Sequence, residues 1–231
     1  MAPVLQALKP DVGMISPRTR ARMVARLRGE GIGDGRVLGV MESVPRHLFV
    51  AEALASRAYE PVSLPIGYGQ TISQPFIVAR MLEALLEDGI PRRVLEVGTG
   101  SGYHTALLAA LGVEVFSIER IEALHHAARE LLGRMGVTRV ALRLGDGSQG
   151  WPEKAEFDAI VFTAAVPCAL PPLYPQLRRG GRLLMPEDLG EGQRLRLYRW
   201  DGREAFGDDL GDCFFVPLLA GTVTQRNQKG A

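Results

Sequence analysis

The 231-residue sequence is poor in cysteine and histidine and carries almost no net charge. Its two cysteines, Cys168 and Cys213, are too few for a disulfide framework, and its four histidines show no spacing typical of a zinc site. We therefore expect no bound metal. A formal net charge of +1 gives no electrostatic reason to expect a nucleic acid or a membrane surface as a partner.

Long hydrophobic runs are absent as well. No apolar stretch approaches the ~20 residues that a membrane-spanning helix needs. Residues 1–9 also lack the basic start, apolar core and cleavage site of a secretory signal, so we expect a cytoplasmic protein. With 46% hydrophobic residues the chain can bury a sizeable core, and its length favours one domain over residues 1–231.

The middle of the chain alternates short β-branched runs with helical stretches. The expected strands cover residues 93–97, 113–118, 140–144, 157–162 and 182–185. The expected helices cover residues 104–111, 121–135 and 173–178. This alternation predicts an α/β fold with a doubly wound, mostly parallel Rossmann-like sheet and helices on both faces. Two further strands, 193–200 and 213–218, follow without a helix between them and predict a C-terminal antiparallel hairpin.

The segment before the sheet has a different pattern. Residues 16–28 and 77–86 are expected to be helical. Between them, residues 58–75 are punctuated by proline and glycine and carry short polar side chains. Such a stretch is too irregular for a core element and suits a lid over a reacting centre.

A glycine-rich loop, Gly98-Thr99-Gly100-Ser101-Gly102, stands between an expected strand and an expected helix. Glycines let the backbone approach a ligand, and the helix N-terminus supplies free N–H groups. The GxGxG spacing differs from the GxGxxG of dinucleotide binders and argues against NAD or FAD. No lysine stands in or beside the loop, which excludes a triphosphate-binding P-loop.

Three acidic residues lie at or near the ends of successive strands. Glu96 precedes the loop and is expected to meet a cationic group. Glu119 follows Gly98 by about twenty residues, where a carboxylate can accept both ribose hydroxyls. Asp146 follows the third strand, where it can accept a hydrogen bond from an adenine amino group. Each acid alone could be a cap or turn residue, but together they predict an adenosine that bears a sulfonium, as in S-adenosylmethionine.

Several motifs resemble one family. The segment 96–103 (EVGTGSGY), with Glu119-Arg120 and Asp146-Gly147, resembles the class I methyltransferases. Residues 44–50 (VPRHLFV) and 64–75 (LPIGYGQTISQP) resemble more specific blocks of the protein-L-isoaspartate O-methyltransferase family. The resemblance covers roughly residues 37–220 and leaves the role of the preceding extension open. His104 departs from the glutamine that is usual in the family.

The resemblance implies a function and a set of site residues. The enzyme would transfer a methyl group from S-adenosylmethionine to the carboxylate of L-isoaspartyl and D-aspartyl residues in damaged proteins, leaving S-adenosylhomocysteine. The ester would then close to a succinimide that partly reopens to normal aspartate. Ser73 would be the active-site residue, and Ile72 and Val216 would contact the substrate peptide. The expected cofactor residues are Gln70, Thr71, Ser73, Glu96, Gly98, Thr99, Gly100, Glu119, Arg120, Asp146 and Gly147.

The chemistry of the acceptor agrees with this implication. A carboxylate with a pKa of ~3.9 is ionised at neutral pH, so its methylation needs alignment and exclusion of water but no general base. Two alternatives remain: a peptide-tailoring enzyme that esterifies ordinary aspartate in a dedicated peptide, and a non-catalytic adenosine-binding module. We divide the domain into an N-terminal helical and substrate or lid segment (1–90), an S-adenosylmethionine-binding α/β core (91–220) and a tail (221–231) expected to fray.

Overall fold

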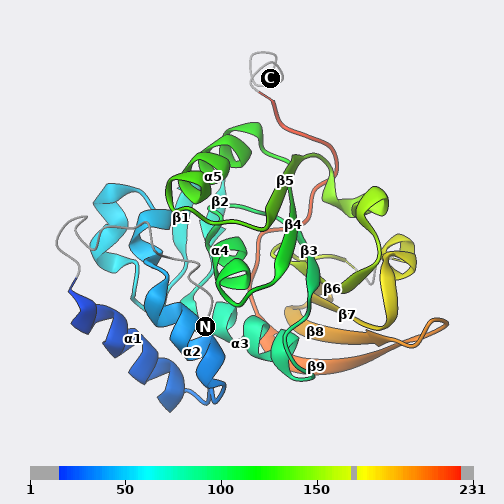
Figure 1. Cartoon of the computed structure of the whole chain (residues 1–231), viewed down its shortest axis with the longest axis horizontal. Helices are drawn as coiled ribbons and strands as arrows, with labels where there is room; N and C mark the ends of the chain where they lie inside the picture. The colour runs from blue at the N-terminus through cyan, green and yellow to red at the C-terminus, as the bar shows by residue number, and fades with distance from the viewer. Residues whose placement is uncertain (1–15, 168–170, 225–231) are drawn as a thin grey trace.

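The computed structural model describes residues 16–167 and 171–224, and its centre is a seven-stranded sheet with the order β5-β4-β3-β6-β7-β8-β9 (Figure 1). The strands from β5 to β7 pair in parallel, whereas β8 and β9 pair antiparallel. The strands of this sheet are β3 (Arg93–Val97), β4 (Glu114–Glu119), β5 (Val140–Leu144), β6 (Phe157–Phe162), β7 (Leu177–Asp188), β8 (Gln193–Trp200) and β9 (Ala205–Cys213). The expected fold class, with its C-terminal hairpin, is confirmed.

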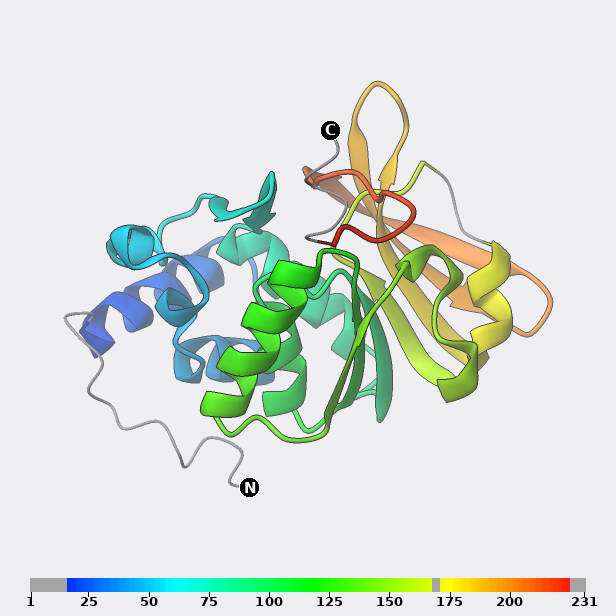
Figure 2. The same cartoon turned by 90° about the horizontal axis from the view of Figure 1, so that it is seen from above.

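The two faces of the sheet are covered differently (Figure 2). Val94 and Val115 pack into a core with the α-helices, whereas the adjacent Leu95 and Phe116 face the opposite side. That opposite face is covered by short 3-10 helices in place of α-helices. The α-helices are α1 (Pro17–Gly29), α2 (Gly35–Ser43), α3 (Pro75–Leu86), α4 (Tyr103–Ala110) and α5 (Glu122–Arg134). The covering 3-10 helices are η3 (Gly147–Gln149), η4 (Pro152–Lys154) and η5 (Pro171–Gln176).

The strand order places a switch point beside β3. The chain steps outward from β3 through β4 to β5, then returns to place β6 on the other side of β3. Connections leaving β3 and β6 therefore diverge at their carboxyl ends, where open α/β sheets bind ligands. In the described part of the chain, no helix is long and apolar enough to cross a membrane.

The expected helix over 173–178 is wrong. Residues 171–176 form the 3-10 helix η5, and β7 already begins at Leu177. Three of the six residues of η5 are proline, at 171, 172 and 175, so few backbone N–H groups remain for α-helical bonds. Gly180 and Gly181 therefore do not stop a helix; they lie in β7, where the register with β6 shifts between residues 157 and 159.

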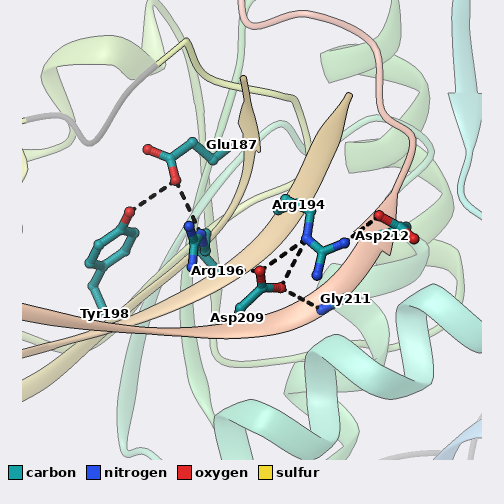
Figure 3. Close-up of polar contacts among 7 residues, drawn as sticks. All are labelled: Glu187, Arg194, Arg196, Tyr198, Asp209, Gly211 and Asp212. Carbon is teal, nitrogen blue, oxygen red and sulfur yellow. Dashed lines mark hydrogen bonds and ion pairs between the residues drawn. The ribbon is translucent and has the colours of Figure 1, made fainter. Parts of the chain in front are cut away.

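The expected strand over 213–218 is also wrong, because the second strand of the hairpin is the polar β9, which ends at Cys213. Figure 3 shows what holds this edge strand: Arg194 on β8 contacts Asp209 at 3.0 Å and Asp212 at 2.5 Å. Arg196 lies 3.4 Å from Glu187 on β7, which also accepts a hydrogen bond from Tyr198 at 3.0 Å. Cross-strand ion pairs thus replace the alternation of apolar residues that identifies a strand in a sequence.

The N-terminal third contains more regular structure than expected. The helices expected over 16–28 and 77–86 correspond to α1 and α3, while α2 and the 3-10 helices η1 (Arg46–Phe49) and η2 (Glu52–Arg57) were not expected. The stretch 58–75 includes an antiparallel hairpin of β1 (Leu64–Gly67) and β2 (Gln70–Ile72). Leu64 and Ile72 are buried, so the expectation that this stretch is too irregular for a core element is wrong. Residues 1–9, Cys168 and most of the tail lie outside the described residues.

Candidate active site

The loop between β3 and α4 is shaped by glycines with positive φ, namely Gly98 (101°), Gly100 (54°) and Gly102 (87°). The N–H of Gly98 donates to the carbonyl of Ile118 on β4 at 2.8 Å. A Cβ atom built on Gly98 would lie 2.2 Å from Oγ1 of Thr163. The backbone here is packed too closely against Thr163 for any side chain, and Gly98 and Gly100 also line the pocket described below.

Glu119 ends β4 beside this loop and is 5% exposed. Its Oε2 atom accepts a hydrogen bond from the N–H of Gly100 at 2.8 Å, and Oε1 accepts one from Ile121 at 2.9 Å. Burial raises the pKa of Glu119, although these amides act in the opposite direction. The carboxylate is held rigidly and keeps lone pairs that can accept further donors.

A C-terminal strap, defined as residues 214–224, crosses the carboxyl ends of the strands (Figure 2). Its Val216 carbonyl accepts from the N–H of Ala165 at 2.8 Å, and the N–H of Leu218 donates back to Ala165 at 2.7 Å. Further along, the N–H of Val223 donates to the carbonyl of Arg120 at 2.8 Å. The strap is thus fixed to the sheet at two places by backbone bonds.

Asp146 and Arg120 hold the middle of the strap. The carboxylate of Asp146 accepts from the N–H of Gly221 at 2.6 Å and from Ser148 at 2.9 Å. Burial acts to raise the pKa of Asp146, but these two amides bring it below its ordinary value. The guanidinium of Arg120 donates to the carbonyls of Gly221 at 3.0 Å and Ala220 at 3.2 Å. These two side chains therefore act mainly on protein backbone.

Glu96 lies in a fully buried polar network below the glycine loop. Its Oε1 atom is 2.8 Å from Nδ1 of His104. Its Oε2 atom accepts from the hydroxyls of Thr105 and Ser117, the latter at 2.6 Å. Ser117 in turn is 2.6 Å from the hydroxyl of Thr99 in the loop. Glu96 thus supports the loop from inside.

The opposite wall is formed by the hairpin β1–β2 and the residues that follow it. Ser73 comes directly after β2 and is half-buried. The fully buried guanidinium of Arg46 donates to the carbonyl of Ser73 at 2.6 Å and to that of Ala58 at 2.7 Å, and lies 4.9 Å from the ring centre of Tyr103. Arg46 therefore joins the backbone at Ser73 to the first turn of α4.

These segments line a pocket that is open to solvent, with about 950 Å³ of empty space when the open side is included. Eleven of the site residues predicted from the sequence line this pocket: Gln70, Thr71, Ile72, Ser73, Gly98, Thr99, Gly100, Glu119, Arg120, Gly147 and Val216. Glu96 and Asp146 are not among its lining residues.

The other lining residues were not predicted from the sequence, and Tyr103, His104 and Thr163 are among them. Tyr103 and His104 form the first turn of α4 directly after the glycine loop, and that position was the available signal. Among the described residues there is no group of three or more histidine, cysteine, aspartate or glutamate side chains that could hold a metal ion. The pocket can therefore bind a ligand through backbone amides, one buried carboxylate and short polar side chains.

Comparisons with known proteins identify the family. The sequence profile of the family described as protein-L-isoaspartate(D-aspartate) O-methyltransferase matches residues 18–223. A protein-L-isoaspartate O-methyltransferase from Alkalilimnicola ehrlichii is 53% identical over 211 residues, which cover 91% of this chain and 96% of that relative. One from Halorhodospira halophila is 54% identical over 213 residues, covering 92% and 96%.

Solved structures agree. One described as a protein-L-isoaspartate O-methyltransferase superposes with a TM-score of 0.80 at 27% identity, covering 91% of this chain and 69% of its own. A Plasmodium falciparum structure, described as such an enzyme in complex with S-adenosyl-L-homocysteine, superposes with a TM-score of 0.76 at 25% identity and covers 87% and 98%. The chain belongs to the protein-L-isoaspartate(D-aspartate) O-methyltransferase family.

Proposed function

We propose that this protein transfers a methyl group from S-adenosylmethionine to the carboxylate of L-isoaspartyl and D-aspartyl residues in damaged proteins. Membership of the family and about 50% identity to relatives named for this activity support the proposal. The observation that carries it is the pocket itself. One side of the pocket is the glycine loop with Glu119, which suits an adenosine. The other side is residues 70–73, which belong to the sequence block that resembles the isoaspartate methyltransferases.

The cofactor fits the residues that are present. The backbone at Gly98 and Gly147 is packed so closely that a Cβ would collide with Thr163 or Val97, at 2.2 and 2.3 Å. Both glycines line the pocket, where their backbones can contact a ligand. Glu119 offers acceptors for the ribose hydroxyls. When bound, S-adenosylmethionine supplies an electrophilic methyl group on a cationic sulfur. Its binding residues would be Gln70, Thr71, Ser73, Gly98, Thr99, Gly100, Glu119, Arg120 and Gly147.

Two nominated cofactor residues receive other roles in this proposal. Glu96 supports the loop through Ser117 and also contacts His104. Asp146 fixes the strap through Gly221 and so shapes the wall beside the adenine. Both act on the cofactor through neighbouring groups.

Alignment is the main task of the remaining residues. Ser73 would orient the attacking carboxylate, while Ile72 and Val216 would contact the substrate peptide. An ionised carboxylate needs no base, so the enzyme has mainly to align it with the methyl group. Such alignment can lower the barrier by roughly 7–11 kcal/mol. Arg46 holds the carbonyl of Ser73 and thereby fixes the backbone on which this alignment depends.

The remaining expectations form part of the same proposal. Residues 1–90 would supply the acceptor side and residues 91–220 the cofactor side, within a cytoplasmic protein that needs no nucleic acid or membrane. The methyl ester would be attacked by the backbone nitrogen of the next residue in the substrate, releasing methanol and forming a succinimide. Hydrolysis of the succinimide would return part of the damaged sites to aspartate.

The test compares labelled methyl transfer to an isoaspartyl peptide and to the same peptide with ordinary aspartate. We expect transfer to the isoaspartyl peptide alone. Transfer mainly to the aspartyl peptide would support the peptide-tailoring alternative, and transfer to neither, with S-adenosylhomocysteine still bound, would support a non-catalytic module.

Ser73→Ala tests the proposed orienting residue. We expect turnover to fall strongly while the dissociation constant of S-adenosylhomocysteine changes little, because Ser73 would be only one of nine residues that bind the cofactor. Ser63→Ala is the matched control, because Ser63 is exposed ten positions earlier on the same segment and is not among the lining residues. Equal turnover of the two variants would remove Ser73 from the mechanism.

A further inference from the structure

His104 is a buried histidine at the wall of the pocket. It is 7% exposed and belongs to the residues that line the pocket. Its Nδ1 atom is paired with Glu96 at 2.8 Å, but its Nε2 atom is buried and has no hydrogen-bond partner among the described residues. A buried polar atom without a partner is costly, so a group that enters the pocket and binds it would be favoured.

The partners of Glu96 determine which kind of group that is. The carboxylate accepts hydroxyl hydrogens from Thr105 and Ser117 on one oxygen and faces His104 with the other. A carboxylate can only accept, so when the imidazole is neutral its single hydrogen lies on Nδ1. Nε2 is then left as an acceptor, and the pair of side chains carries a net negative charge. A cationic donor is therefore the matching ligand.

The strand order shows which part of the cofactor would meet this pair. Gly147 follows β5 and Glu119 ends β4, on the side proposed for the adenine and the ribose. The next strand is β3, whose following loop leads into α4 with His104 in its first turn. The third part of the ligand, its amino-acid moiety, therefore extends over β3 toward His104 and Ser73.

We propose that Nε2 of His104 accepts a hydrogen bond from the α-ammonium group of the cofactor, with Glu96 orienting the imidazole from behind. This inference rests on the proposed cofactor but not on the proposed acceptor. Glu96 thereby meets the cationic ligand through His104 instead of directly. His104 is a cofactor-binding residue in this arrangement, and Glu96 is its positioning residue.

Two ligands separate this role from a structural one. S-adenosylhomocysteine carries the α-ammonium group, whereas 5′-methylthioadenosine has the same adenosine and sulfur without the amino-acid moiety. In His104→Asn the amide can still reach Glu96 in the manner of Nδ1, but nothing replaces Nε2. In His104→Gln the longer amide can replace Nε2. Binding is measured by calorimetry without any acceptor peptide.

We expect His104→Asn to weaken the binding of S-adenosylhomocysteine by roughly 10- to 100-fold, the effect of losing one hydrogen bond to a charged group. Methylthioadenosine should bind to this variant as it does to the wild type. His104→Gln should restore most of the affinity. The control His126→Asn, at an exposed position on α5, should bind both ligands normally.

Three results would overturn the inference: unchanged binding of S-adenosylhomocysteine to His104→Asn, an equal loss for both ligands, or a loss that His104→Gln does not reverse. If the wild type binds neither ligand, the cofactor assignment itself fails and the inference fails with it. Methyl transfer to the wrong peptide would refute only the proposed acceptor, because the binding measurements contain no acceptor.

Discussion

Replacing Gly98 by alanine tests the close packing that opens the glycine loop to a ligand. Gly98 has a φ of 101°, and its missing Cβ would lie 2.2 Å from Oγ1 of Thr163. Thr163 cannot simply rotate away, because its hydroxyl donates to the carbonyl of Gly98 at 2.5 Å and contacts that of Val97 at 3.2 Å. The substitution therefore adds backbone strain and a steric collision at once.

The two costs can be estimated separately. A non-glycine residue in the left-handed region costs about 1–2 kcal/mol. Forcing an extra carbon into a packed site costs roughly 1–3 kcal/mol, which here includes the displacement of the Thr163 hydroxyl. We expect Gly98→Ala to lower the free energy of unfolding by about 2–5 kcal/mol, a large part of the ~5–15 kcal/mol typical of a folded protein.

A double-mutant cycle with Thr163→Ala divides this sum. Removing Oγ1 leaves the nearest remaining side-chain atom, Cβ of Thr163, 3.6 Å from the new methyl group, which is ordinary contact. Thr163→Ala alone should cost ~1 kcal/mol for its hydrogen bonds. In the double variant the collision disappears and the strain at Gly98 remains, so we expect a favourable coupling of roughly 1–3 kcal/mol.

Urea unfolding followed by circular dichroism measures all four proteins, and calorimetry with S-adenosylhomocysteine shows whether the loop still binds. Gly133→Ala is the control, because Gly133 is an exposed residue of α5 with open space around its Cα, and alanine there should stabilise the helix by about 0.5–1 kcal/mol. Strictly additive effects of Gly98→Ala and Thr163→Ala would refute the collision. A cost at Gly98 no greater than that at Gly133 would refute the whole argument.

Three further substitutions test other parts of the site. Arg46→Met removes the donor to Ala58 and Ser73, and urea unfolding should show a loss of about 2–4 kcal/mol. Burial raises the pKa of Glu119, so near this pKa the folded protein keeps a proton that the unfolded chain has released. The free energy of unfolding therefore falls as the pH rises above about 4.3, the pKa in the unfolded chain. Glu119→Gln should remove this fall, which urea unfolding at several pH values without ligand would measure. Asp146→Ala frees the strap, and limited proteolysis should then cleave within residues 214–224 faster than in the wild type.

The central sheet could be predicted from the sequence because its signals are local. The strands over 93–97, 140–144 and 157–162 match β3, β5 and β6 residue for residue. Buried parallel strands consist of continuous apolar runs, and glycines mark where they give way to helices. The same local signals located the glycine loop and Glu119, which the structure brings together through the bond from Gly100.

The errors fall where long-range contacts replace a local pattern. Edge strand β9 alternates few apolar residues, and ion pairs from Arg194 to Asp209 and Asp212 hold it on β8. The hairpin β1–β2 contains one proline and two glycines that indicate a loop, yet Leu64 and Ile72 anchor both of its strands in the core. No window of the sequence around these segments contains the partners that order them.

The roles of Glu96 and Asp146 show the same limit within the site. Their positions at or near strand ends were predicted, but the directions of their side chains depend on groups that the sequence does not place. Glu96 meets His104, eight residues away on the next helix, and Asp146 meets Gly221, which lies in the distant strap. Spacing therefore predicts which strand end carries an acid, and only the packing decides whether that acid faces a ligand or the protein.

In the proposed function, specificity for the acceptor would depend on this indirect support. The two segments proposed to face the acceptor, residues 70–73 and the strap, are held in place partly through their backbones. Arg46 holds the carbonyl of Ser73, and Asp146 holds the N–H of Gly221. Because these hydrogen bonds are made by backbone atoms of Ser73 and Gly221, side chains at the pocket can differ between acceptors without loss of the bonds. A change in substrate preference would then arise from Ile72 and residues 215–219, which are not among the proposed cofactor residues.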